Sequence, residues 1–336
     1  MALRKKFPTF ANVNELKTSI ITQTDSLPAT SDSNFFHSRR LFELCRATPR
    51  LKPYMVVVET AEGRVVAHML AIVRYRTSWF PPYLYSHCRV MGEGVYDADI
   101  SRETLFGTML EALRRKLQNR VLYIEVSNVS QKMFAYKEFK QAGFFPVHWL
   151  SIHNSLHSRT PEERITDKRL RRIKKAYQKG LTTGEVTTPE DFRQFSILLR
   201  RHNILKPKRY IPDDAFFHGI LKGGGGRLFV TKYKGHVIGC SVCVYSENNT
   251  YLWYAAYRRK SYAFLHPDIL TVWHTIKDAH SRGYDHIFFL DTGLPYSKSR
   301  FREFILSFGG KPVSTFRWFR FSIGWLNRIA SWIYHD

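Results

Sequence analysis

The sequence predicts a mixed α/β fold in which one α/β unit occurs twice, with a helical segment between the two copies. Strand-like apolar runs alternate with amphipathic helix-like runs, and the same series of runs appears in both halves of the chain. The length of 336 residues is that of about two domains. Because 44% of the residues are hydrophobic, the chain can form a core, which excludes an intrinsically disordered protein.

The first copy of the unit begins with a hairpin. Two apolar runs flank a turn at Gly63, which is the pattern of two antiparallel strands. A helix with one apolar stripe follows, and a second, shorter helix ends at Gly143. The predicted elements are, in order, strands at 54–59 and 65–73, a helix at 101–117, a strand at 121–126, a helix at 132–141 and a strand at 145–152.

The second copy repeats this order. Gly235 lies in the hairpin turn, and Gly309 follows the last helix, as Gly63 and Gly143 do in the first copy. We expect the final strand to close the sheet of this second unit. The predicted elements are strands at 228–233, 237–245 and 251–256, a helix at 267–282, a strand at 286–291, a helix at 300–307 and a strand at 314–321.

The segment between the copies is predicted to be helical. Thr160 and Thr188 are each followed by proline and two acidic residues, which is the pattern of an N-cap with proline at the first helical position. These boundaries divide the chain into a partly irregular N-terminal segment 1–33, a first α/β domain 34–157, a basic helical insert 158–222, a second α/β domain 223–321 and an amphipathic aromatic helix 322–336.

The charge of the chain indicates an anionic partner. Lys and Arg number 52 against 28 Asp and Glu, which gives a net charge of +24, and the second half holds the larger part of the excess. Such a field attracts nucleic acid, anionic lipid or phosphorylated cofactors without choosing among them. Sequence motifs are needed to decide which of these partners binds.

The densest cationic run is 168–175, which reads KRLRRIKK. Leu170, Ile173 and Tyr177 lie at helical spacing and are expected to pack down while the cations point outward. A solvated helix face and a phosphate-binding face both fit this pattern, although like charges on adjacent turns repel one another unless an anion is bound. The candidate phosphate-binding residues of this run are Arg171, Arg172, Lys174 and Lys175.

A second cationic run, Arg258, Arg259 and Lys260, precedes the helix at 267–282. A loop between a strand and a helix can hold phosphates with its backbone N–H groups, and Ser261 stands where such loops often carry glycine. The serine costs stability only where the backbone needs a positive φ. The four glycines at 223–226 are not followed by Lys-Ser or Lys-Thr, so they form no P-loop.

Asp291 is the candidate catalytic residue. It ends a predicted strand, where a carboxylate could orient an attacking amine or accept its proton, and a turn-capping aspartate is the alternative. Four further residues are candidates for substrate binding because they are aromatic or cationic and lie near these segments: Tyr210, Tyr254, Lys298 and Arg302.

The four cysteines are too few for a disulfide framework and are expected to be core thiols of a protein in the reducing cytoplasm. Cys240 and Cys243 form a CxxC without a second ligand pair, so we expect no metal site. No apolar stretch of about 18 residues occurs, so the protein is expected to be soluble or peripheral at the inner membrane face.

The C-terminal segment carries an aromatic stripe. Trp325, Ile329, Trp332 and Ile333 share one face of the predicted helix. Such a stripe fits either a core contact or a helix that lies in the interface of an anionic membrane.

Several segments resemble, in order, the FemABX-like branch of the GNAT superfamily, which contains the peptidoglycan-bridge aminoacyltransferases. The run 167–176 is similar to the family's basic "RRNIRKA" helix. The tract from Phe289 to Gly310 looks like its "fDlgG…FKxgFGg" signature, with Leu294 in place of a glycine and Glu303 or Ile305 near the place of the lysine. The shorter matches are Asn34 to Ser38, Arg227 to Gly239, and Gly283 to Asp285.

This resemblance implies tandem GNAT-like domains and an acyltransferase that forms an amide from an activated acyl or aminoacyl donor, with an amine acceptor that could be lipid-linked. Acyl-CoA and aminoacyl-tRNA both remain open as the phosphate-bearing donor, and no DNA is expected. GNAT proteins that use CoA hold its pyrophosphate in an R/Q-x-x-G-x-G/A loop that opens a helix. Arg89 to Gly94 matches in letters but is not followed directly by a helix. The alternatives are a CoA-dependent N-acetyltransferase of a soluble acceptor and a non-catalytic RNA- or lipid-binding module.

Overall fold

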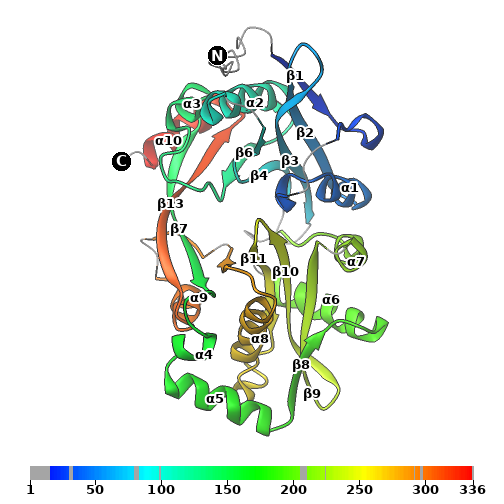
Figure 1. Cartoon of the computed structure of the whole chain (residues 1–336), viewed down its shortest axis with the longest axis vertical. Coiled ribbons are helices and arrows are strands. Elements are labelled where there is room, and N and C mark those ends of the chain that lie inside the picture. The colour runs from blue at the N-terminus through cyan, green and yellow to red at the C-terminus, as the bar shows by residue number, and fades with distance from the viewer. Residues whose placement is uncertain are drawn as a thin grey trace, which may run out of the picture.

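The computed structural model describes residues 16–29, 33–78, 83–97, 100–204, 210–223, 225–290, 292–295 and 298–334. These residues form one mixed sheet flanked by helices (Figure 1). The fold is therefore of the predicted α/β class.

The first half contains the predicted hairpin and both predicted helices, together with a third strand, β4, that the sequence reasoning missed. This strand makes the match to the second half closer than expected, because β11 has the equivalent position there. The elements are β1 Lys17–Ile21, the 3-10 turns η2 Thr24–Ser26 and η3 Phe35–His37, α1 Arg39–Ala47, β2 Leu51–Glu59, β3 Val65–Ser78, β4 Tyr83–Met91, β5 Val95–Tyr96, α2 Arg102–Leu117, β6 Tyr123–Ser127, α3 Tyr136–Gln141 and β7 Phe145–Ser155.

The second half follows the predicted order closely. Thr160 and Glu163 form a capping box at the start of α4, and the Thr188 hydroxyl accepts a hydrogen bond from Asp191 N at the start of α6. The elements are α4 Pro161–Arg164, α5 Asp167–Gln178, β8 Leu181–Glu185, α6 Pro189–Asn203, α7 Asp214–Gly223, β9 Gly226–Tyr233, β10 His236–Ser246, β11 Asn249–Tyr257, η4 Ala263–Leu265, α8 Pro267–Ser281, β12 His286–Phe289, α9 Arg300–Leu306, β13 Lys311–Phe321 and α10 Gly324–Ile333.

Equivalent turns of the two halves share a backbone conformation. Gly143, after α3, and Gly309, after α9, have φ values of +80° and +85°. This left-handed region favours glycine and ends a helix sharply. The repeat seen in the sequence therefore extends to the backbone conformation of these turns.

We expected the last strand to close the sheet of the second unit, but the structure shows otherwise. Instead β13 pairs with β6 and β7 of the first half, while the end of β7 pairs with β12. The strand order is β1-β2-β3-β4-β6-β13-β7-β12-β11-β10-β9-β8, with β5 beside β3. Figure 1 shows β7 and β13 running side by side from one half to the other. Each half thus completes its sheet with a strand from the other half.

The core follows the same pattern. One hydrophobic cluster combines Phe42 and Met55 of the first half with Phe195, Phe217 and Trp253 of the second. The cluster under α2 and α3 contains Trp318, which β13 brings from the C-terminal part of the chain. The two halves therefore share apolar contacts as well as strand pairing.

The four cysteines are buried and unbridged, as predicted. Cys240 and Cys243 stand three residues apart on β10 and belong to clusters on opposite faces of the sheet, so they cannot meet. Burial raises the pKa of the Cys45 thiol to about 12 and raises the pKa of the other three thiols as well. Among the described residues, no helix is long and apolar enough to cross a membrane.

We expect all four thiols to be unreactive toward Ellman's reagent in the folded protein, because burial disfavours the thiolate. Unfolding in guanidinium should release four reactive thiols. Rapid reaction of any thiol in the native protein would contradict this account of the core.

Trp318→Ala should lower the free energy of unfolding by about 3–5 kcal/mol, since Trp318 is fully buried and stacks on Phe139 with ring centroids 4.3 Å apart. Denaturant unfolding of the variant measures this change. Trp325→Ala is the control: Trp325 is 59% exposed, and its loss should change stability by about 0.5 kcal/mol or less. Equal effects of the two substitutions would show that β13 does not hold the first half together.

Candidate functional site

The basic helix α5 has one buried side and one cationic side. Ile173 and Ala176 are buried, Leu170 is half-buried and Tyr177 is 37% exposed, so Ala176 takes the inward place expected for Tyr177. Thr166 caps the helix by accepting a hydrogen bond from Arg169 N. The candidate residues Arg171, Arg172, Lys174 and Lys175 are all exposed, as expected for the outward face.

Arg169 attaches α5 to α9. Its guanidinium carbon lies 4.7 Å from the ring centroid of Phe308 and 5.5 Å from that of Phe304, and it donates a hydrogen bond to the Ser307 hydroxyl. The contact fixes the orientation of α5, so the remaining cations of the helix point away from the protein.

The second cationic run lies in the loop between β11 and α8, where the sequence placed it. Arg258, Arg259, Lys260 and Ser261 are exposed. Ser261 does not have a positive φ, so serine at this position costs no backbone strain. The left-handed residue of the loop is His266, with φ of 50°, directly before Pro267.

Helix α5 meets this loop at the start of α8. Lys179 Nζ donates to Phe264 O at 3.2 Å, and Arg259 Nε lies 3.5 Å from Asp268 Oδ2. Burial, and next the charge of Arg172, lower the pKa of His266, so its imidazole is neutral at pH 7. Arg172 and Arg259, from separate segments, therefore both lie near the start of α8, where Asp268 of the first turn pairs with Arg259.

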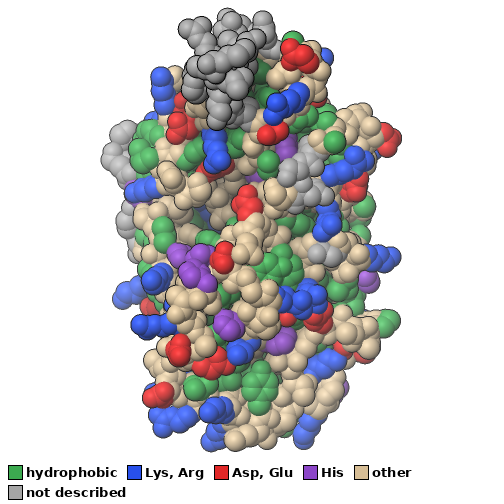
Figure 2. All heavy atoms as spheres, viewed as in Figure 1, with side chains coloured by type: hydrophobic (Ala, Val, Ile, Leu, Met, Phe, Trp, Pro, Cys, Tyr) green, Lys and Arg blue, Asp and Glu red, His purple; other side chains and the backbone are tan. Residues whose placement is uncertain are grey.

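The exposed cations form a surface patch. Figure 2 shows Lys and Arg side chains gathered along the lower edge of the molecule, where Figure 1 places α5. Salt screens the attraction between exposed charges, so the affinity of this patch for an anion should fall as the salt concentration rises.

The remaining predicted residues are distributed around the second half. Asp291 lies outside the described residues; its neighbour Leu290 donates its N–H to Leu252 O at 3.4 Å. Lys298 is exposed. Arg302 donates hydrogen bonds to Leu294 O at 2.6 Å and to Pro295 O at 3.3 Å, so it supports the loop before α9. Tyr210 and Tyr254 line a small cavity between the two halves.

The second half contains a pair of parallel strands that separate. In the second half β11 and β12 pair only from Asn249–His286 to Leu252–Phe289, and β11 then continues alone on that side among the described residues. Trp253 is a bulge, because Val242 opposes Tyr254 and Cys243 opposes Leu252. In the first half, by contrast, β4 and β6 stay paired up to their ends at Met91 and Ser127.

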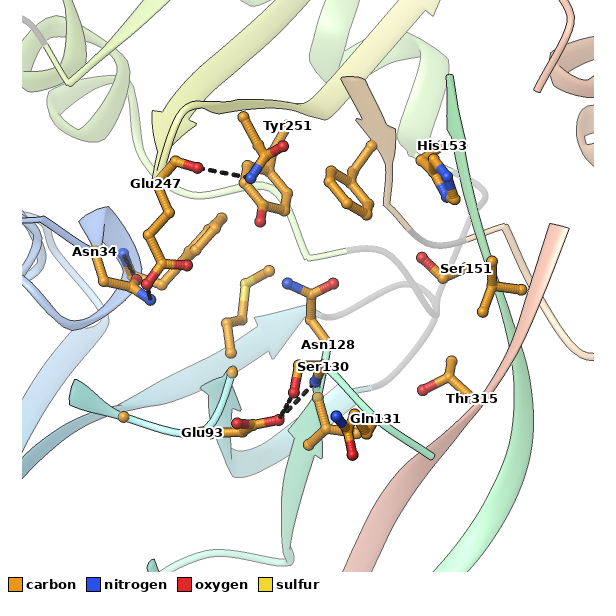
Figure 3. Close-up of a pocket in the computed structure, with 18 of the residues that line it drawn as sticks. Asn34, Glu93, Asn128, Ser130, Gln131, Ser151, His153, Glu247, Tyr251 and Thr315 are labelled. Atoms are coloured by element: carbon orange, nitrogen blue, oxygen red, sulfur yellow. Dashed lines mark hydrogen bonds between the residues drawn. The ribbon is translucent and has the colours of Figure 1, made fainter. Parts of the chain in front are cut away.

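The opening beyond β4 and β6 is a large cleft of about 920 Å³, lined by both halves (Figure 3). Glu93 Oε1 accepts hydrogen bonds from the backbone N–H and the hydroxyl of Ser130, each at 2.6 Å. On the opposite wall, Asn34 donates to Glu247 at 3.1 Å. Burial, followed by His286, lowers the pKa of His153. Polar groups of both halves therefore face a common space large enough for a sizeable substrate.

The segment Arg89 to Gly94, which matches the CoA-loop pattern in sequence, is not a phosphate loop of the expected kind. Only its last part, Met91 to Gly94, lines this cleft. β5 follows it, and α2 begins only at Arg102. Arg89 points to Ser127 and Glu125, at 3.2 and 3.4 Å from its Nε. A Cβ at Gly94 would lie 2.8 Å from His68 O, so close backbone packing requires this glycine.

The sequence reasoning missed four arginines that converge between the halves: Arg74, Arg76, Arg89 and Arg317. Arg74 and Arg76 alternate within an apolar strand, so both side chains lie on one face of the sheet. Charges at alternate positions of a strand next to buried residues were the available signal.

The second half matches a known family. Residues 167–298, from α5 to the loop before α9, match the family model described as an acetyltransferase (GNAT) domain. The match includes the basic helix, the β11–α8 loop and the separating strands β11 and β12. No curated protein sequence matches the chain.

The whole chain has the fold of tandem GNAT proteins. It is similar to FemX, with 12% identity, a TM-score of 0.57 and coverage of 84% of this chain and 90% of that one. A tandem GNAT protein from the clavulanic acid biosynthesis pathway has 11% identity and a TM-score of 0.56, with 92% and 99% coverage. N-myristoyltransferase from Saccharomyces cerevisiae with bound myristoyl-CoA has 12% identity and a TM-score of 0.57, with 95% and 85% coverage. The predicted tandem GNAT-like fold is thus confirmed.

Proposed function

We propose that this protein transfers an acyl or aminoacyl group from a phosphate-bearing donor to an amine, and that the donor binds to the second half. The observation that carries the proposal is the meeting of two cationic segments, α5 and the loop 258–261, at the start of α8. The strand that leads into this loop, β11, leaves β12 after Leu252. The GNAT domain match covers all of these elements.

The reaction requires only groups that such a site can offer. The amine nitrogen attacks the acyl carbonyl, the bond from that carbonyl to the donor's sulfur or oxygen breaks, and the amine loses one proton. We assign the orientation of the amine, or the acceptance of its proton, to Asp291. No covalent enzyme intermediate is needed.

Acyl-CoA and aminoacyl-tRNA share the chemistry that this patch would recognise, which is a set of phosphates. The myristoyl-CoA bound by the yeast structure of the same fold supports a CoA thioester. The spread of exposed cations along α5 supports a longer polyanion. The cleft beyond β4 and β6 would then receive the acceptor, because its volume of about 920 Å³ is large enough for a sizeable substrate and both halves line it.

Arg171→Glu combined with Lys174→Glu should weaken donor binding about tenfold or more, because two attractive charges become repulsive. Titration of CoA and of aminoacyl-tRNA, each at two salt concentrations, measures the effect and identifies the donor. A tRNA donor shows a steep loss of affinity with salt, and the variant reduces that slope.

The matched control is Lys116→Glu combined with Lys222→Glu, which changes the net charge equally at exposed positions on α2 and α7. Equal losses in both variants would show that only the overall charge matters. Asp291→Asn should abolish transfer and leave donor binding intact. Unchanged transfer would assign the base to another residue, and the absence of any transfer by the wild-type protein would favour a non-catalytic binding module.

The C-terminal helix α10 exposes the apolar stripe predicted from the sequence. Trp332 is 80% exposed, Ile333 60%, Trp325 59% and Ile329 48%. Its other side is fixed, since Asn327 donates to Gly143 O at 3.1 Å and Ala330 is buried. The stripe is therefore not buried against the core of the described part of the chain.

We propose that α10 lies in the interface of an anionic membrane. Exposed cations lie on α2 and α3, which Figure 1 places at the same end of the molecule. Tryptophan and isoleucine between cations are the composition of a helix that inserts at the level of the lipid headgroups. Such a location would suit a lipid-linked acceptor.

Trp325→Ser combined with Trp332→Ser should lower binding to mixed phosphatidylcholine and phosphatidylglycerol vesicles about tenfold or more, measured by sedimentation. Phe264→Ser removes an aromatic ring that is 61% exposed at the other end of the molecule and should have no effect. Binding that is lost equally in both variants, or that is as strong to pure phosphatidylcholine, would refute the proposal.

A further inference from the structure

Three histidines gather where β7 of the first half meets β12 of the second. His153 lies on β7, His157 follows the end of that strand, and His286 is the first residue of β12. The ring centroid of His286 lies 5.3 Å from that of His153 and 5.3 Å from that of His157. The cluster therefore lies across a junction of the two halves.

This junction is a short one. β7 and β12 pair over four residue pairs, the last of which is Ile152 with Phe289, whereas β7 and β13 pair over nine. Within the short pairing His153 stands opposite Phe288, and their ring centroids are 5.4 Å apart. Because a short ladder has few hydrogen bonds to lose, it can open locally while the rest of the sheet stays paired.

The cluster extends from the cleft between the halves to the surface. Figure 3 shows His153 at the wall of the cleft, on the same side as Ser151, and Phe288 also lines the cleft. His286 is half-buried, and His157 is exposed. A change in the pairing of β7 with β12 therefore changes a wall of the cleft.

The charged groups that act on the cluster in the described part of the chain are two cations and one carboxylate. Lys311 of β13 stands opposite His153 in the strand register and disfavours its protonation. Arg164 of α4 disfavours the protonation of His286, and Asp285, which directly precedes β12, favours it. One carboxylate therefore stands against two cations and three rings that each gain a positive charge on protonation.

The rings are neutral in the closed junction. Burial, and next the neighbouring histidine, lowers the pKa of His153 and that of His286, so both imidazoles are neutral at pH 7. Asn249 Oδ1 lies 3.2 Å from His286 Nδ1, a contact in which the neutral ring donates its N–H.

These lowered pKa values set the direction of a pH effect. The closed junction binds fewer protons than an open one, in which histidine has its ordinary pKa of about 6.5. The contribution of the neutral rings to stability is therefore complete above about pH 7 and is lost as the pH falls through about 6.5.

We propose that His153, His157 and His286 form a pH-sensitive latch, which holds β7 against β12 while the rings are neutral and releases this pairing in mild acid. Two imidazolium rings with centroids 5.3 Å apart repel each other, and Lys311 and Arg164 add to the repulsion. Release separates His153 from β12 and widens the cleft on that side. The pairing of β13 with β7 keeps the halves joined.

Hydrogen–deuterium exchange of the full chain at about pH 7.5 and about pH 5.5 tests the latch, after correction for the intrinsic pH dependence of amide exchange. At about pH 5.5 a histidine of ordinary pKa is protonated about ten times as often as it is neutral, so exchange at 152–155 and 286–289 should rise about tenfold or more. The segments 123–126 and 318–321, where β6 pairs with β13, should not change. No rise at the junction, or an equal rise in all four segments, would overturn the proposal.

His153→Gln combined with His286→Gln removes two titrating rings and should abolish the rise at the junction. His236→Gln, at the exposed first residue of β10, is the matched control and should keep the full rise. A full rise in the double variant would show that these histidines are not the latch. If the double variant does not fold, the comparison of the four segments in the wild-type protein decides. The test needs neither donor nor acceptor, so its outcome is independent of the proposed transfer reaction.

Discussion

The antiparallel pairing of β7 with β13 is the constraint on which the rest of the structure depends. Along Phe145–His153 the pairing joins the last strand of each half. Because β13 also pairs with β6, and β7 with β12, neither half has a complete sheet without the other. Two repeated units thereby become one sheet, and the clefts at their junction have walls from both.

This junction brings charged and polar side chains together between the halves. A sheet face buried by a second unit is normally apolar, as the face under α2 is. Part of the opposite face carries Arg74, Arg89 and Glu125 beside a cavity, while the rest of this face packs into the hydrophobic cluster that the two halves share.

The sequence was sufficient to predict the repeat, because periodic apolar runs and turn glycines are local signals. It was also sufficient for the outward face of α5 and for the loop at 258–261. It could not predict the exchange of β13, since an alternating strand fits any sheet edge and its partner depends on long-range geometry. The arginine cavity was missed for a similar reason: Arg74 and Arg317 are remote in the chain, and only the fold brings them together. The assignment of Asp291 stays a prediction.

The central claim, that the donor binds to the second half, is tested most directly by hydrogen–deuterium exchange of the full chain with and without CoA or aminoacyl-tRNA. The account predicts slower exchange in 167–178 and 258–270, which contain α5 and the start of α8. Protection confined to the loops of the cleft beyond β4 and β6, at 92–95 and 128–132, would contradict it and place the donor in the first half.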